Sequence, residues 1–435
     1  MLIGRTYESA YFEEYMKRPG SQLVVFYGQK FMGKTAFLLD FCKDRPFSYC
    51  LAKPGNEQSA KEELQAAVSR ISEIESDDKK ILIVDEFQYF SKDATFMPFC
   101  LEQMVQDRWL IIFVSSAINW VETSMVKTFG KSAAKISGFH KCKELRFADI
   151  CKLYPDYPRT NLFILYSILG GIPGLWNFLD MSLDVRANIE QCVLSDRSYM
   201  RHAGYLYCME SLRESGVYDT ILSAMAQGNT KLNDLNKVTG YSRAKISVYL
   251  KTLMEQGQIE KVYAVECDGA ENAKKGIYEI NSSFTDFWFT FIYPHEKELA
   301  LLTPGEFYDR YIKEQLIRYC EKYLKKIVKE YMVINGVMPS ARKAVPSRFP
   351  GKKHEIDIVW KKDEQYTAVW CSKLKAMVTY DDYMELLEGL KEAGIKLANC
   401  YVVSYKQFDE KLTLEARMKE SLHLLTLEEI MQAFA

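Results

Sequence analysis

The segment GQKFMGKT, residues 28–35, constrains the fold of this chain more than any other stretch. It follows the β-prone run QLVVFY and precedes AFLLDF, which has the composition of a helix. Gly28 and Gly33 permit the backbone turns that point amides inward at a helix N-terminus, where anions bind. Lys34 adds positive charge, and Thr35 adds a hydroxyl for Mg²⁺. This order predicts a phosphate-binding loop of the Walker A type, made of Gly28, Gln29, Lys30, Phe31, Met32, Gly33, Lys34, Thr35 and Ala36.

A second apolar run, in KKILIVDEFQYF, is expected to complete the nucleotide site. Residues 81–84 are typical of a buried parallel strand that ends in acids. Asp85 would hold Mg²⁺ through water, and Glu86 would act as general base on the attacking water. A third strand, WLIIFVSSAI, ends in Ser115 and Ser116, which we expect to sense the γ-phosphate. The predicted catalytic pair is Glu86 with Lys34, and the predicted Mg²⁺ ligands are Thr35 and Asp85.

Strands that alternate with helices predict a doubly wound parallel sheet. Residues 45–53, RPFSYCLAK, are a further predicted strand between the phosphate-binding loop and the acidic strand. A strand inserted between these two would fit the RecA-like ATPase arrangement. The chain carries no guanine-reading N-K-x-D after the acidic strand, which favours ATP over GTP.

Composition limits the surroundings and partners of the chain. With 435 residues, 48% of them hydrophobic, it is long enough for roughly three packed domains. A net charge of −1 means that any nucleic-acid contact must come from a local patch. The 11 cysteines form no C-x-x-C pair, the N-terminus lacks a signal pattern, and no apolar run approaches ~20 residues. We expect a cytoplasmic protein with no membrane partner.

Five segments taken in order resemble the archaeal-type P-loop ATPases of the STAND/AAA-like group, found in archaea and bacteria. They are IGRTYESAYFEEYM, FYGQKFMGKT, ILIVDEFQYF, FADICKLYPDY and LYSILGGIPGLWNFL. The resemblance spans the whole chain, and it implies that Gly4-Arg5 opens the ATPase domain. It also implies that Gly170-Gly171-Ile172-Pro173 lies in a helical lid. Members often carry a Gly-Arg after the third strand, and its arginine is a candidate arginine finger. The matching pair in this chain is Gly138-Phe139. Lys135 or Lys141 could substitute for that arginine, or a partner could supply it.

Residues 217–282 have the order of a winged helix: helix, helix, turn, helix, then two strands across a predicted wing, CDGAENAK. Gly240 breaks between the second and third helices, and Ser242 can cap the third. Ile246, Leu250 and Leu253 share its buried face. Lys245, Val248, Lys251 and Thr252 fall on the opposite face, which would either lie in a DNA groove or form an ordinary solvated surface.

The C-terminal third has the helix–strand–turn–strand–helix–strand order of a restriction-endonuclease-like core, which the resemblance also implies. Asp357 and Lys373 stand where such nucleases place an acid and a lysine, but Cys371 replaces the central glutamate. A thiol is a poor ligand for hard Mg²⁺. We therefore expect a degenerate nuclease site, composed of Glu314, Glu355, Asp357, Cys371 and Lys373. A basic run beside it includes Arg348, Lys352 and Lys353.

These observations predict a multidomain α/β chain: a RecA/AAA-like P-loop ATPase core (1–155), a helical lid (156–216), a winged helix (217–282) and a nuclease-like, inactive domain (283–435). The favoured function is an ATP-binding, ATP-hydrolysing molecular switch with Mg²⁺ as cofactor. The alternatives are an ATP-gated, Mg²⁺-dependent DNA nuclease and a DNA- or partner-binding scaffold with little ATPase activity. DNA would contact Arg348, Lys352 and Lys353 or the helix at Lys245–Lys251, and a homo-oligomer is compatible with this class.

Overall fold

The computed structural model divides the chain into two compact units, one of residues 1–145 with 171–178 and one of residues 146–170 with 179–435. It describes residues 2–55, 57–106, 108–201, 215–263, 276–338, 347–348, 355–362, 365–372, 377–392 and 394–434. Within these ranges, no helix is both long and apolar enough to cross a bilayer. The finer division into four domains stays a prediction.

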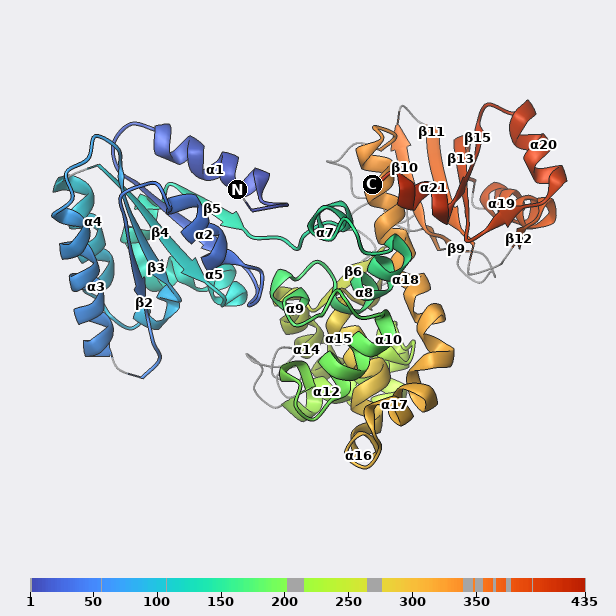
Figure 1. The fold of residues 1–435 in the computed structure, drawn as a ribbon, viewed down its shortest axis with the longest axis horizontal. Coiled ribbons are helices and arrows are strands. Elements are labelled where there is room, and N and C mark those ends of the chain that lie inside the picture. The colour runs from blue at the N-terminus through green and yellow to red at the C-terminus, as the bar shows by residue number, and fades with distance from the viewer. Residues whose placement is uncertain are drawn as a thin grey trace. The chain divides into compact units, whose positions relative to one another are not determined.

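The first unit is built on a five-stranded sheet in which every pairing is parallel, as the alternation of strands and helices predicted (Figure 1). Its order is β2-β3-β4-β1-β5. The strand inserted between β1 and β3 is therefore β4, and β2, the strand predicted from RPFSYCLAK, lies at the edge. The strands are β1 (Gln22–Tyr27), β2 (Phe47–Leu51), β3 (Lys80–Asp85), β4 (Trp109–Ser115) and β5 (Gly138–Lys141).

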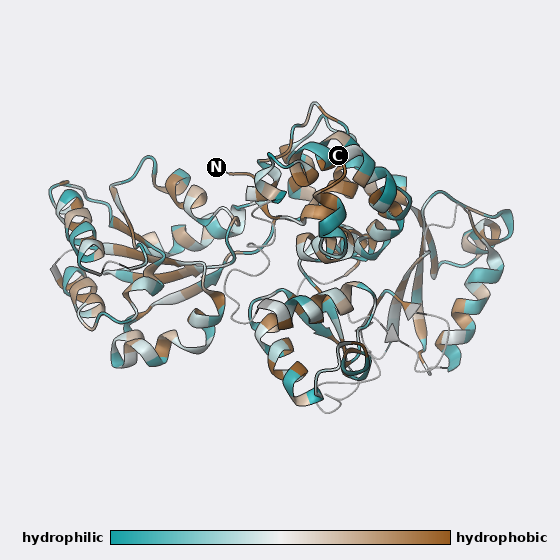
Figure 2. Cartoon of the chain, turned by 90° about the horizontal axis from the view of Figure 1, so that it is seen from below, coloured by the Kyte–Doolittle hydropathy of each residue, from teal (hydrophilic) through white to brown (hydrophobic). Residues whose placement is uncertain are grey.

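Helices cover both faces of this sheet. On one face Leu82, Val84 and Ile111 pack in a single core with residues of α3 (Glu57–Ser72) and α4 (Phe96–Gln106). On the other, Phe26 packs edge-on against Phe12 of α1 (Thr6–Lys17) and Phe37 of α2 (Lys34–Cys42). Successive strand residues point to opposite faces, so an all-apolar strand such as β4 requires both helical layers. Figure 2 shows hydrophobic colour along the strands of this sheet. Short elements complete the unit: η1 (Phe87–Phe90), α5 (Ile118–Thr123), α6 (Met125–Phe129), η2 (Gly130–Lys135) and α9 (Pro173–Trp176).

The second unit begins with helices and contains the predicted helix-turn-helix. Helix α13 (Leu232–Thr239) ends at Gly240, which has φ +73°, and α14 (Arg243–Glu255) begins after Ser242, whose Oγ accepts from the Lys245 amide. Ile246, Leu250 and Leu253 are fully buried, as their spacing predicted. The preceding helix is α12 (Ser215–Ala226), and the antiparallel strands β6 (Ile259–Val262) and β7 (Ile277–Ile280) follow. The predicted wing between them lies outside the described residues.

The helical parts of this unit on either side of the helix-turn-helix are mostly short. They are α7 (Phe147–Leu153), α8 (Arg159–Leu169), α10 (Val185–Asn188), η3 (Ile189–Leu194), α15 (Ser283–Phe287), η5 (Trp288–Ile292), η6 (Tyr293–His295), α16 (Glu296–Leu299), α17 (Pro304–Phe307) and η7 (Tyr308–Ile312). The long α18 (Lys313–Ile334) follows. Glu330 of α18 accepts hydrogen bonds from the amides of Phe147 and Ala148, so α18 is tied to the start of α7.

The C-terminal part holds a four-stranded mixed sheet of order β10-β11-β13-β15, with β10 antiparallel to β11 and the other pairs parallel. The strands are β10 (Ile358–Lys362), β11 (Gln365–Cys371), β13 (Leu397–Ser404) and β15 (Leu422–Thr426). Val359, Ala368 and Val402 face α19 (Tyr380–Glu392) and α20 (Glu410–Met418), which lie together on one side of the sheet in Figure 1. The remaining elements are β8 (Ser347–Arg348), β9 (Glu355–Ile356), β12 (Met377–Val378), β14 (Gln407–Phe408) and α21 (Leu427–Gln432).

Candidate functional site

The loop between β1 and α2 has the geometry of an anion cradle at a helix N-terminus. Gly33 precedes α2 with φ +77°, and Phe31 also lies in the left-handed region, at φ +63°. The Lys34 ammonium folds back over the loop and donates to the carbonyl oxygens of Gly28 at 2.7 Å and Gln29 at 2.8 Å. Burial lowers the pKa of Lys34, because a charged ammonium is costly away from water. A phosphate group would provide the negative charge that this buried ammonium requires.

Thr35 and Asp85 meet where the loop faces the end of β3. The Thr35 hydroxyl donates to Asp85 Oδ2 at 2.6 Å, and the tyrosine hydroxyl of Tyr49, on β2, donates to the same oxygen at 2.9 Å. The other oxygen, Oδ1, accepts from the Glu86 amide at 2.9 Å. A hydroxyl and a carboxylate in contact beside a phosphate cradle are hard oxygen donors of the kind that Mg²⁺ prefers. Tyr49 was missed in the sequence, since nothing in a strand residue predicts which neighbour its hydroxyl reaches.

Glu86 is held in a strained and well-anchored position. Its backbone lies in the left-handed region at φ +53°, which costs a non-glycine residue about 1–2 kcal/mol. One carboxylate oxygen, Oε2, accepts three hydrogen bonds: from Ser116 Oγ at 2.8 Å, the Ser116 amide at 3.1 Å and Gln88 Nε2 at 2.5 Å. Such strain persists where the surroundings over-determine it, and it is typical of functional positions.

Ser115 takes part in this network through Gln88. Its hydroxyl is fully buried and donates to Gln88 Oε1 at 2.7 Å, while Gln88 Nε2 donates to Glu86. Two serines at the carboxyl end of β4 therefore act on the same oxygen of Glu86, Ser116 directly and Ser115 through Gln88. Gln88 was not singled out from the sequence, because it follows the strand by three residues and only the fold brings it to β4.

Arg5 anchors the phosphate-binding loop through hydrogen bonds. Its buried guanidinium donates to the carbonyl of Met32 at 2.6 Å and to that of Lys143 at 2.7 Å, and it pairs with Glu8 at 3.0 Å. Burial opposes ionisation of Glu8, but hydrogen bonding with His140 and the charge of Arg5 outweigh it, so the pKa of Glu8 is lowered. The Arg5 side chain thus ties the loop to the start of α1, which gives the predicted opening Gly4-Arg5 a structural role.

The segment from Gly171 to Phe178 packs on the same loop. The Gly174 amide donates to the Phe31 carbonyl at 2.9 Å, and a Cβ on Gly174 would lie 2.7 Å from the Phe31 Cβ. Gly171 is equally constrained, since a Cβ there would lie 1.8 Å from the Leu145 carbonyl oxygen. Gly171, which belongs to the predicted lid segment, therefore allows close approach to the Leu145 backbone, and Gly174 allows close approach to the phosphate-binding loop.

At the predicted arginine position, Gly138 and Phe139 lie in β5. A Cβ on Gly138 would lie 2.0 Å from the Tyr15 hydroxyl, so this glycine is required by packing against α1. The Lys141 ammonium pairs with Glu122 at 2.9 Å, and Lys135 ends the short helix η2. A catalytic role for either lysine stays a prediction.

The third helix of the helix-turn-helix presents the expected face. Val248 is 65% exposed, and Lys245 and Lys251 are exposed as well. The Lys245 ammonium lies 4.5 Å from the Tyr241 ring centre, and Lys251 pairs with Glu255 at 3.8 Å. Two exposed lysines that flank a small apolar side chain can approach a phosphate backbone, but a nearby acid partly neutralises one of them.

In the C-terminal sheet the structure brings Asp357 and Cys371 together. The Cys371 amide donates to Asp357 Oδ2 at 2.7 Å. Burial and the Asp357 charge raise the pKa of the Cys371 thiol well above its usual range, so the sulfur stays protonated. The positive charge of Lys325, on α18, lowers the pKa of this thiol but does not offset the effect of burial. Glu314 lies eleven residues earlier on the same helix, about 16 Å along its axis.

Several predicted residues of this region cannot be placed. Lys352, Lys353 and Lys373 lie outside the described residues, and of Glu355 and Arg348 only the backbone is described. Within the described part of the chain, no group of three His, Cys, Asp or Glu side chains could hold a metal ion. A nuclease-like domain, active or degenerate, stays a prediction.

Two family models match parts of the chain. Residues 288–378 match a family described as archaea bacterial proteins of unknown function, and residues 220–261 match the bacterial regulatory protein arsR family. The second match coincides with the helix-turn-helix and β6. An uncharacterized protein of Methanocaldococcus jannaschii is 23% identical over 355 residues, which cover 77% of each chain.

Two archaeal proteins of known structure are distantly similar to this chain. A Walker-type ATPase of Pyrococcus abyssi is 16% identical, with a TM-score of 0.47, over 66% of this chain and 96% of that one. The ORC2 protein of Aeropyrum pernix, in ADPNP and ADP complexes, is 13% identical with a TM-score of 0.43, over 66% and 94% of the two chains. Likenesses this distant leave the function to be argued from the site itself.

Proposed function

We propose that this chain is an ATP-binding, ATP-hydrolysing molecular switch. The observation that carries the proposal is the convergence of three features at the carboxyl edge of one parallel sheet. These are the phosphate cradle with Lys34, the Thr35–Asp85 pair, and the anchored carboxylate of Glu86. Binding sites in open α/β sheets lie at this edge. No other group of described residues combines an anion cradle with a metal-ligand pair and a base.

Each residue of the site has a distinct role. The amides of the loop and the Lys34 ammonium bind the β- and γ-phosphates. The Thr35 hydroxyl and, through water, the Asp85 carboxylate hold Mg²⁺, which when bound offsets the negative charge on the phosphates. Glu86 takes the proton of the attacking water through Oε1, because its Oε2 is occupied by Ser116 and Gln88.

The direct test is the Glu86→Gln variant, which keeps the size of the side chain and removes its basicity. We expect ATP affinity to be retained and turnover to fall by about 10²-fold or more. The matched control is Glu73→Gln, which removes an exposed carboxylate of the same unit and should leave turnover unchanged. Wild-type turnover in Glu86→Gln would refute the assigned base.

The helix-turn-helix supports a second proposal, that the switch associates with DNA weakly and without sequence preference. Its support is the match of residues 220–261 to a regulatory family and the exposed Lys245 and Lys251. The basic run at Lys352 and Lys353 is more concentrated, so reversing both charges there should weaken binding more than reversing Lys245 and Lys251. Fluorescence anisotropy with a labelled duplex measures this ranking.

The control for the DNA experiment is charge reversal at Lys391 and Lys396, two exposed lysines of the C-terminal part. The opposite ranking of the first two variants would place DNA on α14. Equal binding by all three variants would refute a lysine-dependent DNA contact.

We further propose that the C-terminal domain does not cleave DNA. The support is that Asp357 accepts a hydrogen bond from the Cys371 backbone and that the neighbouring thiol is held protonated. A protonated thiol beside one carboxylate is a poor site for a hard cation. Robust Mg²⁺-dependent nicking of a plasmid by the wild type, abolished by Asp357→Ala, would refute this and favour an ATP-gated nuclease.

A further inference from the structure

The face of the C-terminal sheet that points away from α19 and α20 carries a pocket. Its floor follows one row across three strands, because Trp360 of β10 pairs with Thr367 of β11, and Thr367 pairs with Asn399 of β13. Paired residues of neighbouring strands share a face, so these three side chains project to the same side of the sheet. The cavity has a volume of about 410 Å³, within the range of roughly 300–1,000 Å³ typical of small-molecule sites.

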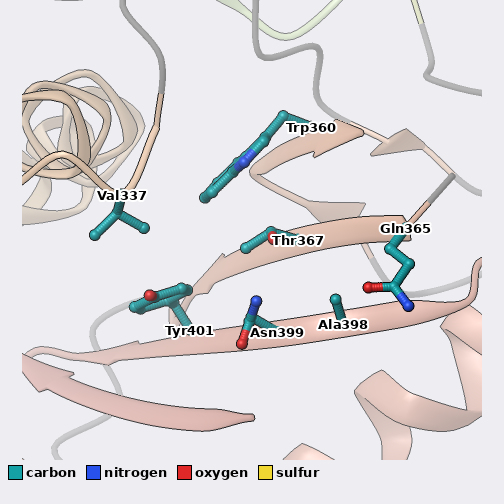
Figure 3. Close-up of a pocket in the computed structure, with 7 residues that line it drawn as sticks. All are labelled: Val337, Trp360, Gln365, Thr367, Ala398, Asn399 and Tyr401. Carbon is teal, nitrogen blue, oxygen red and sulfur yellow. The ribbon is translucent and has the colours of Figure 1, made fainter. Parts of the chain in front are cut away.

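Two aromatic rings bound this pocket. Figure 3 shows Trp360 and Tyr401 on opposite sides of the space, with Thr367 between them and Val337 closing one end. The indole is 6% exposed, so it is fixed by packing. Tyr401 is fixed by its neighbour on β15, because its ring stacks on that of His423, its paired residue, with 4.3 Å between ring centres. Rigid aromatic walls bind planar ligands at little entropic cost.

The polar groups of the pocket are neutral and face the same space. Thr367 offers a hydroxyl, and Asn399 and Gln365 offer carboxamides, each both donor and acceptor. Among the residues that the structure describes, none of these three side chains has a hydrogen-bond partner, although Thr367 is only 8% exposed. The described lining residues carry no charge, so this lining offers no ionic partner to a phosphate or a metal ion.

We propose that this pocket binds a nucleobase. A nucleobase combines a flat apolar face, which stacks on Trp360 or Tyr401, with an uncharged edge of donors and acceptors that suits carboxamides such as Asn399. Its ribose or phosphate would extend out of the pocket, whose described lining offers those groups no charged partner. The base belongs either to a free nucleoside or nucleotide or to an unpaired position of a single strand, and both sources present the same chemistry.

The test uses the full chain and ligands without phosphate, because the phosphate-binding loop recognises phosphate groups. Adenosine, guanosine, cytidine and uridine are titrated by isothermal titration calorimetry, with ribose as the ligand that lacks a base. We expect at least one nucleoside to bind and ribose not to bind. Asn399→Leu and Thr367→Val, which nearly keep side-chain volume, should weaken that binding by about tenfold and threefold respectively.

A second readout follows Trp360 itself. Nucleoside binding should quench the intrinsic fluorescence of the wild type, and the quenching should be lost in Trp360→Phe. The matched control is Gln432→Leu, which removes an exposed carboxamide on α21 and should leave both readouts unchanged. Circular dichroism and thermal melting check that each variant is folded. If Trp360→Phe does not fold, Asn399→Leu and Thr367→Val still test the proposal.

The source of the base is decided by a parallel titration with a twelve-nucleotide single strand and with a closed hairpin duplex. Tighter binding of the single strand than of any nucleoside, weakened by Asn399→Leu, assigns the pocket to a strand. Equal or weaker binding assigns it to a free nucleoside or nucleotide. Absence of binding by every nucleoside and by the strand, or binding that Asn399→Leu and Thr367→Val leave unchanged, overturns the proposal.

Discussion

Replacing Ser116 with alanine removes one of the three donors that hold Glu86. The other two, the Ser116 amide and Gln88 Nε2, remain in place. If Glu86 is the general base, the lost hydroxyl loosens the carboxylate without removing it. We therefore expect Ser116→Ala to lower kcat while the affinity for ATP stays near that of the wild type.

The magnitude follows from the strength of one hydrogen bond to a charged group. Such a bond contributes about 1.5–3 kcal/mol, and each 1.36 kcal/mol of activation free energy is about tenfold in rate. Two hydrogen bonds to Glu86 remain in the variant, so the lower end of this energy range applies and kcat should fall by about tenfold. Ser115→Ala acts one step further away, through a neutral bond to Gln88 at 2.7 Å, and should cost about threefold.

The assay is steady-state ATP turnover with a separate measurement of nucleotide affinity. Ser116→Thr retains a hydroxyl and should restore much of the rate, whereas Ser124→Ala, a serine whose hydroxyl contacts Thr123, is the matched control. Wild-type kcat in Ser116→Ala would show that Ser116 does not position the base. An increased kcat would show that it restrains Glu86 instead, and a change confined to affinity would place Ser116 in ground-state binding.

The remaining predictions concern Lys34 and Cys371. Lys34→Ala should weaken ATP binding by at least about 100-fold with the fold retained by circular dichroism, because it removes the ammonium that lies over the carbonyls of Gly28 and Gln29. Near wild-type affinity would refute the assignment of Lys34 to phosphate binding. Burial lowers the pKa of Lys34 and bound phosphates raise it, so binding should take up a proton at pH values between the two, and affinity should fall as pH rises through that window. Calorimetry in buffers of different ionisation enthalpy measures the uptake, and identical heats would contradict it. Cys371→Glu places a second carboxylate in a buried position beside Asp357, so the unfolding temperature should drop by several degrees in EDTA and recover with Mg²⁺. Cys371→Ser should show no Mg²⁺ response, and a glutamate variant insensitive to Mg²⁺ would show that more than this ligand was lost.

The sequence alone determined the local features whose causes are local. The spacing of Gly28, Gly33, Lys34 and Thr35 predicted the loop, because the turn and the helix start depend on residues next to each other in the chain. The start of α14 could be predicted from Ser242 for the same reason, since the hydroxyl of an N-cap residue accepts a hydrogen bond from an amide three residues later. The buried stripe of α14 followed from helical periodicity.

Only the tertiary structure decided which groups meet across elements. Strand order placed β2 and β4 on either side of β3, and that order brings Ser116 to Glu86, Ser115 to Gln88 and Tyr49 to Asp85. A strand reveals which residues share a face, because its side chains alternate, but not which strand lies next to it. The pocket at Trp360, Thr367 and Asn399 is hidden in the sequence for that reason: its row exists only after β10, β11 and β13 have paired in one register.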